Sequence, residues 1–384
     1  TEARRAPVWQ RALLALRGPV LSIVTALAVG AVVLVFTDPD TLGSWSKFSS
    51  NPGRAFRDSW HLVADAYEAL FRGAFGTPAA WSETFVAATP LILAGLAVGF
   101  AFRSGLFNIG GSGQALLGSL TAAYVGFHYD WPLAIHIPVA LLAAAVAGGL
   151  WAGVAGLLKA RTGAHEVIST IMLNYIALHL VDYLLGTKPF LRPGRADPIT
   201  PPVHESAQLP KLLGAQYRLH VGIVVALVLA ALIWWLLFRT TVGFRLRTVG
   251  ANPNAATYAG MSVATTWVLA MAISGGLAGL AGGIQMLGVQ KSLSGGLPSV
   301  GFDAIALALL GRAHPAGIVA ASILFGALAA GGTQMQGTTG TPVDMITVIQ
   351  ALIIAFIAAP ALIRAIWRVK EPEGTGQVLA TGWG

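Results

Sequence analysis

The sequence predicts an all-α polytopic membrane protein with about ten transmembrane segments, and three observations lead to that class. Of the 384 residues, 55% are hydrophobic and only 10% are charged, whereas a soluble domain usually carries about 25% charged residues. Apolar runs recur that are near the roughly 20 residues needed to cross the hydrocarbon core. Alternating segments of about ten residues, which are typical of a membrane β-barrel, are absent from the sequence.

The first predicted elements are a cytoplasmic N-terminus over 1–18 and a transmembrane helix over 19–36. A cleavable signal peptide is the alternative, but this apolar run is longer than a typical h-region and ends in TDPD rather than at an A-x-A site. An external segment over 37–83 follows, in which Asn51-Pro52 starts a helix with a capping side chain and a first-turn proline. Its apolar residues recur at helical spacing: Phe56, Trp60, Val63, Tyr67, Leu70, Phe71 and Ala74. This amphipathic helix either caps the helix bundle or docks an extracellular partner.

The remaining segments form a core over 84–366, and a cytoplasmic tail over 367–384 follows it. The core divides into two sets of four segments, over 84–186 and 264–363, joined by a linking helix over 220–238. Each set has a full-length, an interrupted and two more full-length segments: 84–102, 106–127, 133–158 and 168–186, then 264–288, 303–311, 316–332 and 344–363. The first set begins outside and the second inside, which is the arrangement of an inverted repeat. Broken helices at matching positions of such repeats mark a substrate path.

The net charge of +8 could indicate a nucleic-acid partner, but the positions of the charges indicate a membrane topology instead. With both termini inside, the cytoplasmic segments hold fourteen basic and four acidic residues, and the rest of the chain holds ten basic and twelve acidic residues. The positive-inside rule therefore favours N-in and C-in and explains the charge without nucleic acid. The exception is 187–219, which we expect to be an ordered external loop. The chain has no cysteine, which excludes disulfides and thiolate metal sites.

The stretch GLFNIGGSGQALLG, residues 105–118, places glycines and polar side chains between two membrane segments. Irregular backbone at membrane depth is tolerated where it lines a cavity or is buried in protein. Uncharged polar groups in and near such a break suit a neutral polar cargo, although each is also suited to bonding helices together. The candidates for a substrate pathway are Asn108, Ser112, Gln114, Ser169, Asn174 and Gln285, with Thr170 and Ser274 beside them.

A second polar segment, 239–263, is predicted to lie at the cytoplasmic surface. Asn252-Pro253 begins a short helix there, NAATYAGM, which is too short to be stable alone in water. Its small residues, Ala255, Ala256, Ala259 and Gly260, leave a surface that could fit a partner's groove. The alternative is an ordinary loop packed on its own bundle.

No residue set in the sequence has the pattern of a catalytic or metal site. The G-x-x-x-x-G-K-[ST] phosphate loop is absent, and the eight histidines show no zinc-ligand spacing. Ionisable residues in the spans are few: His179 and Asp182 lie near the outer end of their helix, and Asp303 and Asp344 are expected as helix N-caps. Energy must come from another chain or from an ion gradient, so an ion-coupled secondary transporter stays open as an alternative.

Three stretches resemble, in order, the landmarks of one family: 105–118, HEVISTIMLNYIALHLVDYLL at 165–185, and VGANPNAATYAGMSVATTWVLAMAISGGLAGLAGG at 249–283. The family is the permease subunits of bacterial ABC importers for nucleosides and simple sugars, related to the ribose and branched-chain amino-acid permeases. The resemblance covers roughly 84–366. The chain departs from the family at His165, where an asparagine is usual, and at Ser112, where an acidic residue is frequent.

The resemblance implies a non-catalytic permease with a fold like that of type II ABC importers, placed in the bacterial cytoplasmic membrane. It implies that the 249–261 segment couples to an ABC ATPase subunit through Asn252, Ala255, Ala256, Tyr258 and Gly260. ATP and magnesium would then bind to that ATPase, and this chain would bind no cofactor. A second, homologous permease in a heterodimer and an extracytoplasmic substrate-binding protein complete the expected assembly. The expected cargo is a nucleoside or a related neutral polar solute, with ribose or another simple sugar as the alternative.

Overall fold

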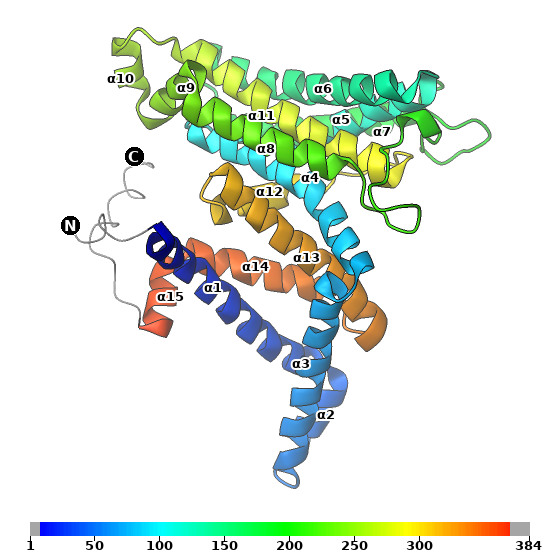
Figure 1. The fold of residues 1–384 in the computed structure, drawn as a ribbon, viewed down its shortest axis with the longest axis vertical. Helices are drawn as coiled ribbons and strands as arrows, with labels where there is room; N and C mark the ends of the chain where they lie inside the picture. Colours follow the sequence, from blue (N-terminus) through cyan, green and yellow to red (C-terminus); the bar gives the residue numbers. More distant parts are fainter. Residues whose placement is uncertain (1–7, 369–384) are drawn as a thin grey trace. The chain divides into compact units, whose positions relative to one another are not determined.

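The computed structural model describes residues 8–368, apart from the side chains of 8–16, 360 and 361. Residues 1–7 of the predicted N-terminus and 369–384 of the predicted tail lie outside the described residues. The described chain is helical almost throughout (Figure 1). Within it, extended pairing is limited to two isolated β-bridges, Ile199 with Ser294 and Lys211 with His220.

The α-helices run in chain order with bounds that follow the sequence prediction closely. They are α1 Val8–Thr37, α2 Pro39–Ser46, α3 Pro52–Phe75, α4 Pro78–Arg103, α5 Gly111–His128, α6 Leu133–Thr162, α7 Glu166–Leu185, α8 Gly222–Arg239, α9 Thr241–Ala251, α10 Pro253–Tyr258, α11 Val263–Gln285, α12 Val300–Leu310, α13 Pro315–Thr339, α14 Asp344–Ala358 and α15 Pro360–Trp367. A short 3-10 helix, Glu205–Ala207, lies in the loop after α7, and a π-helical turn, Met286–Gln290, extends α11.

Seven of these helices are long and apolar enough to cross a membrane: α1, α4, α6, α7, α8, α11 with its π-helical turn, and α13. Two more, α12 and α14, are apolar but shorter. Nine of the ten predicted segments each overlap one α-helix, and the tenth, 344–363, covers α14 and part of α15. The class of a polytopic all-α membrane protein is therefore confirmed. The number of ten crossings and the repeat stay predictions.

Three sequence predictions about helix ends are corrected. The segment 344–363 is not one helix, because α14 ends at Ala358 and α15 begins at Pro360; proline lacks the N–H and clashes with the preceding turn. Asp303 is not an N-cap, since α12 begins three residues earlier, at Val300. Asp344 is the first residue of α14 rather than its cap, which is the position of Val343.

The described chain forms two compact units, one made of 8–84 with 327–368 and the other of 85–326. In the first, α2 and α3 form a helical hairpin: the Ser44 hydroxyl donates to Asp58 at 2.6 Å, and the Trp45 indole donates to Ser59 at 2.9 Å. The predicted cap on α3 is confirmed, since the Asn51 side chain accepts from the Arg54 N–H at 3.1 Å.

The buried face of α3 differs from the predicted apolar face. Its buried residues are Ala55, Ala66, Leu70 and Ala74. Phe56 and Trp60 remain 60% and 73% exposed, respectively. Tyr67 is tied down by a hydrogen bond from its hydroxyl to the Leu27 carbonyl of α1 at 2.5 Å. Small residues therefore make most of the buried contact of α3, while Tyr67 contacts α1 and Phe56 packs against the Trp45 ring of α2 at 5.4 Å.

In the second unit, α11 lies along α6 and α5 (Figure 1). Glycines allow this approach, as small residues do between membrane helices generally. A Cβ placed on Gly118 of α5 would lie 2.2 Å from the Gly279 carbonyl of α11, and one placed on Gly148 of α6 would lie 2.3 Å from the Gly275 carbonyl. The glycine-dense stretch 274–283 is thus a helix-packing surface.

The loop 187–219 is ordered by backbone hydrogen bonds, as the sequence predicts. Thr200 and Val203 donate to the carbonyls of Leu293 and Lys291, at 3.0 and 2.9 Å. The buried His136 ring of α6 bonds to the Ser206 hydroxyl at 2.9 Å and to the Val125 carbonyl at 3.0 Å. The loop is therefore fastened to the ends of α5, α6 and α11.

Candidate functional site

The helix break between α4 and α5 is closed by a pair of buried amides. Asn108 is fully buried; its Nδ2 donates to Gln114 Oε1 at 2.9 Å, and Gln114 Nε2 donates back to Asn108 Oδ1 at 3.0 Å. Asn108 Nδ2 also donates to the Ser274 hydroxyl of α11 at 2.8 Å, and that hydroxyl donates to the Ala97 carbonyl of α4 at 2.7 Å. The amide pair thus fixes the break to the helices on both sides of it.

Helix α7 satisfies the backbone groups that the break leaves open. Asn174 Oδ1 accepts from the Gly113 N–H at 2.8 Å, and its Nδ2 donates to the Ile109 carbonyl at 2.9 Å. The Thr170 hydroxyl accepts from the Ile109 N–H at 3.3 Å. Unsatisfied backbone groups cost several kcal/mol each inside a bilayer. Asn174 and Thr170 remove that cost for the Gly113 and Ile109 groups that they bond.

The structure brings together three of the six predicted pathway residues, Asn108, Gln114 and Asn174, with Thr170 and Ser274. Ser112 is buried nearby, and its hydroxyl has no hydrogen-bond partner in the described chain. The other two lie apart from the amide pair. Ser169 is half-buried and donates to the His165 carbonyl of its own helix at 3.2 Å, and Gln285 is half-buried at the end of α11. That any of the six residues lines a path stays a prediction. Asn108, Gln114 and Asn174 hold the broken backbone in place through their hydrogen bonds.

Sequence reasoning missed two close contacts made by glycines of the break. Gly111, at the start of α5, meets Gly301, at the start of α12: a Cβ on Gly301 would lie 2.1 Å from the Ser112 nitrogen. Gly105, which has a φ of +70°, meets Gly250 of α9: a Cβ on Gly250 would lie 2.6 Å from the Gly105 nitrogen. The sequence shows these glycines, but it does not show which glycine of one segment contacts which glycine of another, because that depends on the three-dimensional arrangement.

The predicted coupling segment is a capped helix with one buried residue. The Asn252 side chain accepts from the Ala255 N–H at 3.0 Å at the start of α10. Tyr258 is 95% exposed, and Ala255 is exposed as well. Gly260 ends the segment with a φ of +76°. Ala256 is fully buried, so it does not belong to the surface predicted to fit a partner's groove, and anchors α10 instead.

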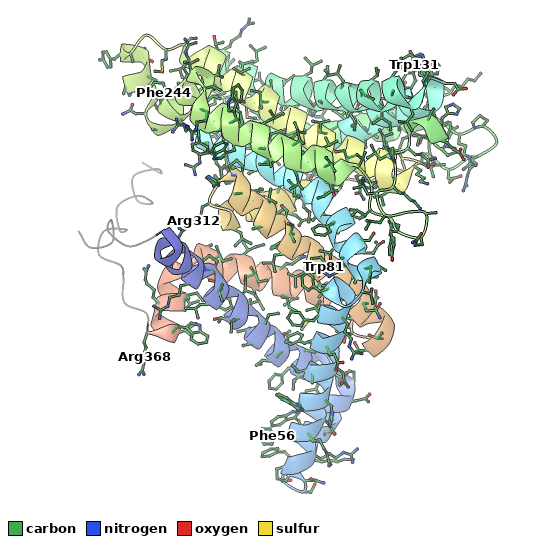
Figure 2. All side chains as sticks on the ribbon, viewed as in Figure 1. Phe56, Trp81, Trp131, Phe244, Arg312 and Arg368 are labelled. Atoms are coloured by element: carbon green, nitrogen blue, oxygen red, sulfur yellow. The ribbon has the colours of Figure 1, made fainter. Side chains whose placement is uncertain are left out.

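A cavity of about 550 Å³ lies beside α10, between α9 and the start of α11. Its lining is mixed, with the aromatic ring of Phe244 (Figure 2), the guanidinium of Arg245 and the hydroxyls of Ser262 and Thr265. The cavity is therefore lined by α9, by the start of α11 and by Ala259–Ser262, the residues that follow α10 directly.

A polytopic helical protein with a broken helix, closed by uncharged polar side chains, has an arrangement that is found in membrane transporters. The comparisons with known proteins agree. Residues 81–359 match the family described as branched-chain amino acid transport system / permease component. The guanosine ABC transporter permease protein NupP of Bacillus subtilis is 42% identical over 93% of this chain and 97% of its own. The chain therefore belongs to this family of ABC transporter permeases.

Two further relatives differ in the solute that their names give. The glucose ABC transporter permease protein TsgB13 of Haloferax volcanii is 33% identical over 92% of this chain and 89% of its own. The guanosine ABC transporter permease protein NupQ of Bacillus subtilis is 30% identical over 63% of this chain and 78% of its own. No solved structure gives a significant match.

Proposed function

We propose that this chain is the permease of an ATP-driven importer that moves nucleosides across the bacterial cytoplasmic membrane. The observation that carries the proposal is the 42% identity, over nearly the whole chain, to a guanosine permease. The uncharged polar groups at the helix break are compatible with a neutral cargo of that kind. A simple sugar is the second candidate, because a glucose permease is 33% identical over a similar length.

Competition for uptake separates these substrates. Cells carrying the complete transporter are given labelled guanosine with an excess of unlabelled uridine, ribose or glucose. A nucleoside importer is inhibited by uridine and unaffected by either sugar. Inhibition by ribose or glucose alone would establish the sugar importer, and uptake that follows a proton gradient without ATP would establish the secondary transporter.

The proposed architecture is two inverted four-helix repeats, α4–α7 and α11–α14. Equivalent contacts support it. In one pair, α11 (first helix of its set) contacts α6 (third helix of the other set) at Gly275 and Gly148. In the reciprocal pair, α4 (first helix) contacts α13 (third helix) at Gly95 and Ile318. The two interrupted helices meet at their own starts, through Gly111 and Gly301. Two repeats related by a pseudo-two-fold axis are expected to make such reciprocal contacts.

The proposed topology has ten crossings with both termini inside, which places 187–219 outside and α10 inside. Because the chain has no cysteine, single cysteines can be read without background. Leu213→Cys, at a loop residue that is 48% exposed, is expected to react with a membrane-impermeant thiol reagent on intact cells. Thr257→Cys is expected to react only in inverted vesicles. The opposite labelling pattern would reverse the topology.

The proposed partners are an ABC ATPase at α10, a second permease and an external binding protein. The sequence supports the first, because it has no phosphate loop of its own. The two guanosine permeases of Bacillus subtilis, both similar to this chain, support a permease pair.

The neighbouring alanines of α10 provide a matched test of the coupling role. Ala255 is exposed and Ala256 is fully buried. Ala255→Trp is expected to leave the folded yield unchanged, to retain the ATPase and to separate ATP hydrolysis from transport, because it adds bulk only on the outer surface. Ala256→Trp is expected to displace α10 and to lower the amount of ATPase that copurifies. Normal coupled transport in both variants would place the ATPase contact elsewhere.

A further inference from the structure

A basic cluster surrounds one aromatic ring at the end of the helices that carries α9 and α10. The ring is Phe238, near the end of α8. The Arg247 guanidinium of α9 lies 5.3 Å from its centroid, and the Arg103 guanidinium, at the end of α4, lies 5.7 Å away. The His314 ring stacks on Phe238 at 5.5 Å. Four separate segments thus converge on this point.

The His314 ring does not add to the positive charge at neutral pH. Burial, and then the charge of Arg103, lower the pKa of His314 below its ordinary value. The charge at the ring comes from Arg103 and Arg247. The exposed Arg312 lies in the adjacent α12–α13 turn (Figure 2).

Arg103 already has acceptors. Its Nε donates to the Ala313 carbonyl at 2.9 Å, and its Nη2 donates to the Arg312 carbonyl at 3.1 Å. These two acceptors belong to consecutive residues in the left-handed region, with φ values of +48° for Ala313 and +53° for Arg312, a conformation that costs energy in any residue except glycine. Arg103 therefore stabilises this turn, which holds the exposed Arg312 beside the cluster.

Arg247 has no such acceptor. Its Nε atom is buried and makes no hydrogen bond within the described chain. None of the ion pairs among the described residues includes Arg103, Arg247 or Arg312. A guanidinium carries five donors. Arg247 is half-buried, and leaving its buried Nε–H without an acceptor costs free energy. The cation–ring contact with Phe238 is the interaction of this guanidinium within the described residues, so its remaining donors are available to an anion.

The position of the cluster favours a protein anion over a lipid phosphate. Helix α8 turns a different side outward, where Trp234 and Trp235 are exposed and Arg239 lies over the Trp234 ring at 5.5 Å. Phe238 is half-buried and faces α4, α9 and the α12–α13 turn. Moreover, α9 continues through Asn252 directly into α10. The cluster is on the end of the bundle, next to the proposed coupling helix, and not on its outward-facing side.

We propose that a carboxylate side chain of the ATPase subunit pairs with Arg247 inside this basic cluster, as a second contact beside α10. The inference rests on the proposed function, which places the ATPase at this end of the chain. A planar guanidinium binds a carboxylate through two parallel hydrogen bonds. Such a pair would fix the orientation of the bound ATPase and add to its affinity. It would be a second point of contact beside the six-residue helix α10.

The test compares Arg247→Gln with Arg161→Gln in the complete transporter. Arg161 is an exposed arginine in the last turn of α6, also on the proposed cytoplasmic side. Arg247→Gln is expected to leave the folded yield of the permease unchanged and to weaken ATPase binding by about tenfold or more, which is within the range for truncating one partner of a buried charge pair. Arg161→Gln is expected to bind the ATPase as the wild type does. Arg247→Glu is expected to recover binding when one acidic residue of the ATPase is changed to arginine.

Three outcomes would overturn the inference. Equal ATPase binding by Arg247→Gln and Arg161→Gln would remove the pair. Equal losses of folded yield in Arg247→Gln and Arg247→Lys would make Arg247 a residue of the fold alone. ATPase binding that needs phosphatidylglycerol in the nanodisc, with that need abolished in Arg247→Gln, would assign the cluster to a lipid phosphate. If the wild-type permease retains no ATPase at all, the proposed function fails instead, so the two failures are distinguishable.

Discussion

Asn108→Leu is expected to reduce the yield of folded permease, not only its rate of transport. Asn108 is fully buried and takes part in hydrogen bonds with Gln114, Ser274 and the Gly110 N–H. Leucine satisfies none of them, and each buried group left without a partner costs about 1–3 kcal/mol. The loss is therefore a large fraction of the free energy of unfolding of an ordinary protein. The measurement is the amount of monodisperse protein after detergent extraction, together with uptake per folded molecule.

The control for Asn108→Leu is Ser169→Ala, at a predicted pathway residue whose hydroxyl donates only within its own helix. We expect it to fold at the wild-type level. Normal yield of Asn108→Leu with low uptake per molecule would contradict the packing role and restore Asn108 as a residue of the path.

Gly279→Leu is expected to lower the yield of folded permease strongly. A Cβ at this position would lie 2.2 Å from the Ala144 carbonyl and 3.1 Å from the Gly148 Cα. These are backbone atoms, which cannot move away by a change of rotamer as a side chain can. The loss in free energy of unfolding is therefore expected to exceed the about 1–3 kcal/mol typical of overpacking. Folded yield should fall below about a tenth of the wild type.

Gly153→Leu is the matched control for Gly279→Leu. Gly153 also lies in a membrane helix, α6, but a Cβ there would meet nothing within 4 Å. Its yield is expected to be unchanged. Equal yields from the two leucine variants would show that α6 and α11 separate at little cost.

Hydropathy and cap signals were enough to predict where the helices lie. Asn51 and Asn252 cap helices at the predicted positions, because an amide before a proline satisfies first-turn N–H groups in any context. The start of α12 was predicted three residues late, because Asp303 was taken as its cap, and the end of α14 was predicted five residues late, because apolar residues continue through Pro360. A run of hydrophobic residues indicates that a segment favours lipid, but it does not define the residue at which the helix begins or ends.

Which face of each helix is packed could not be predicted from the same signals. Lipid is as apolar as the protein interior, so a membrane helix needs no hydrophobic stripe to mark its packed face. Ala256 and Ala255 are identical and adjacent, yet one is buried and the other exposed. The partners of Asn108 and Asn174 likewise lie on α5, α11 and the break itself. Such pairings depend on long-range proximity, which a single sequence does not contain.

The contact between Gly105 and Gly250 has a mechanical consequence. Where helices touch through side chains, small displacements are absorbed by rotamer changes. Here backbone meets backbone, since even one methyl group on Gly250 would lie 2.6 Å from the Gly105 nitrogen. A displacement of α9 is therefore transmitted directly to the backbone at residue 105, which lies three residues before Asn108. The backbone at that residue is expected to move by a distance similar to the displacement of α9.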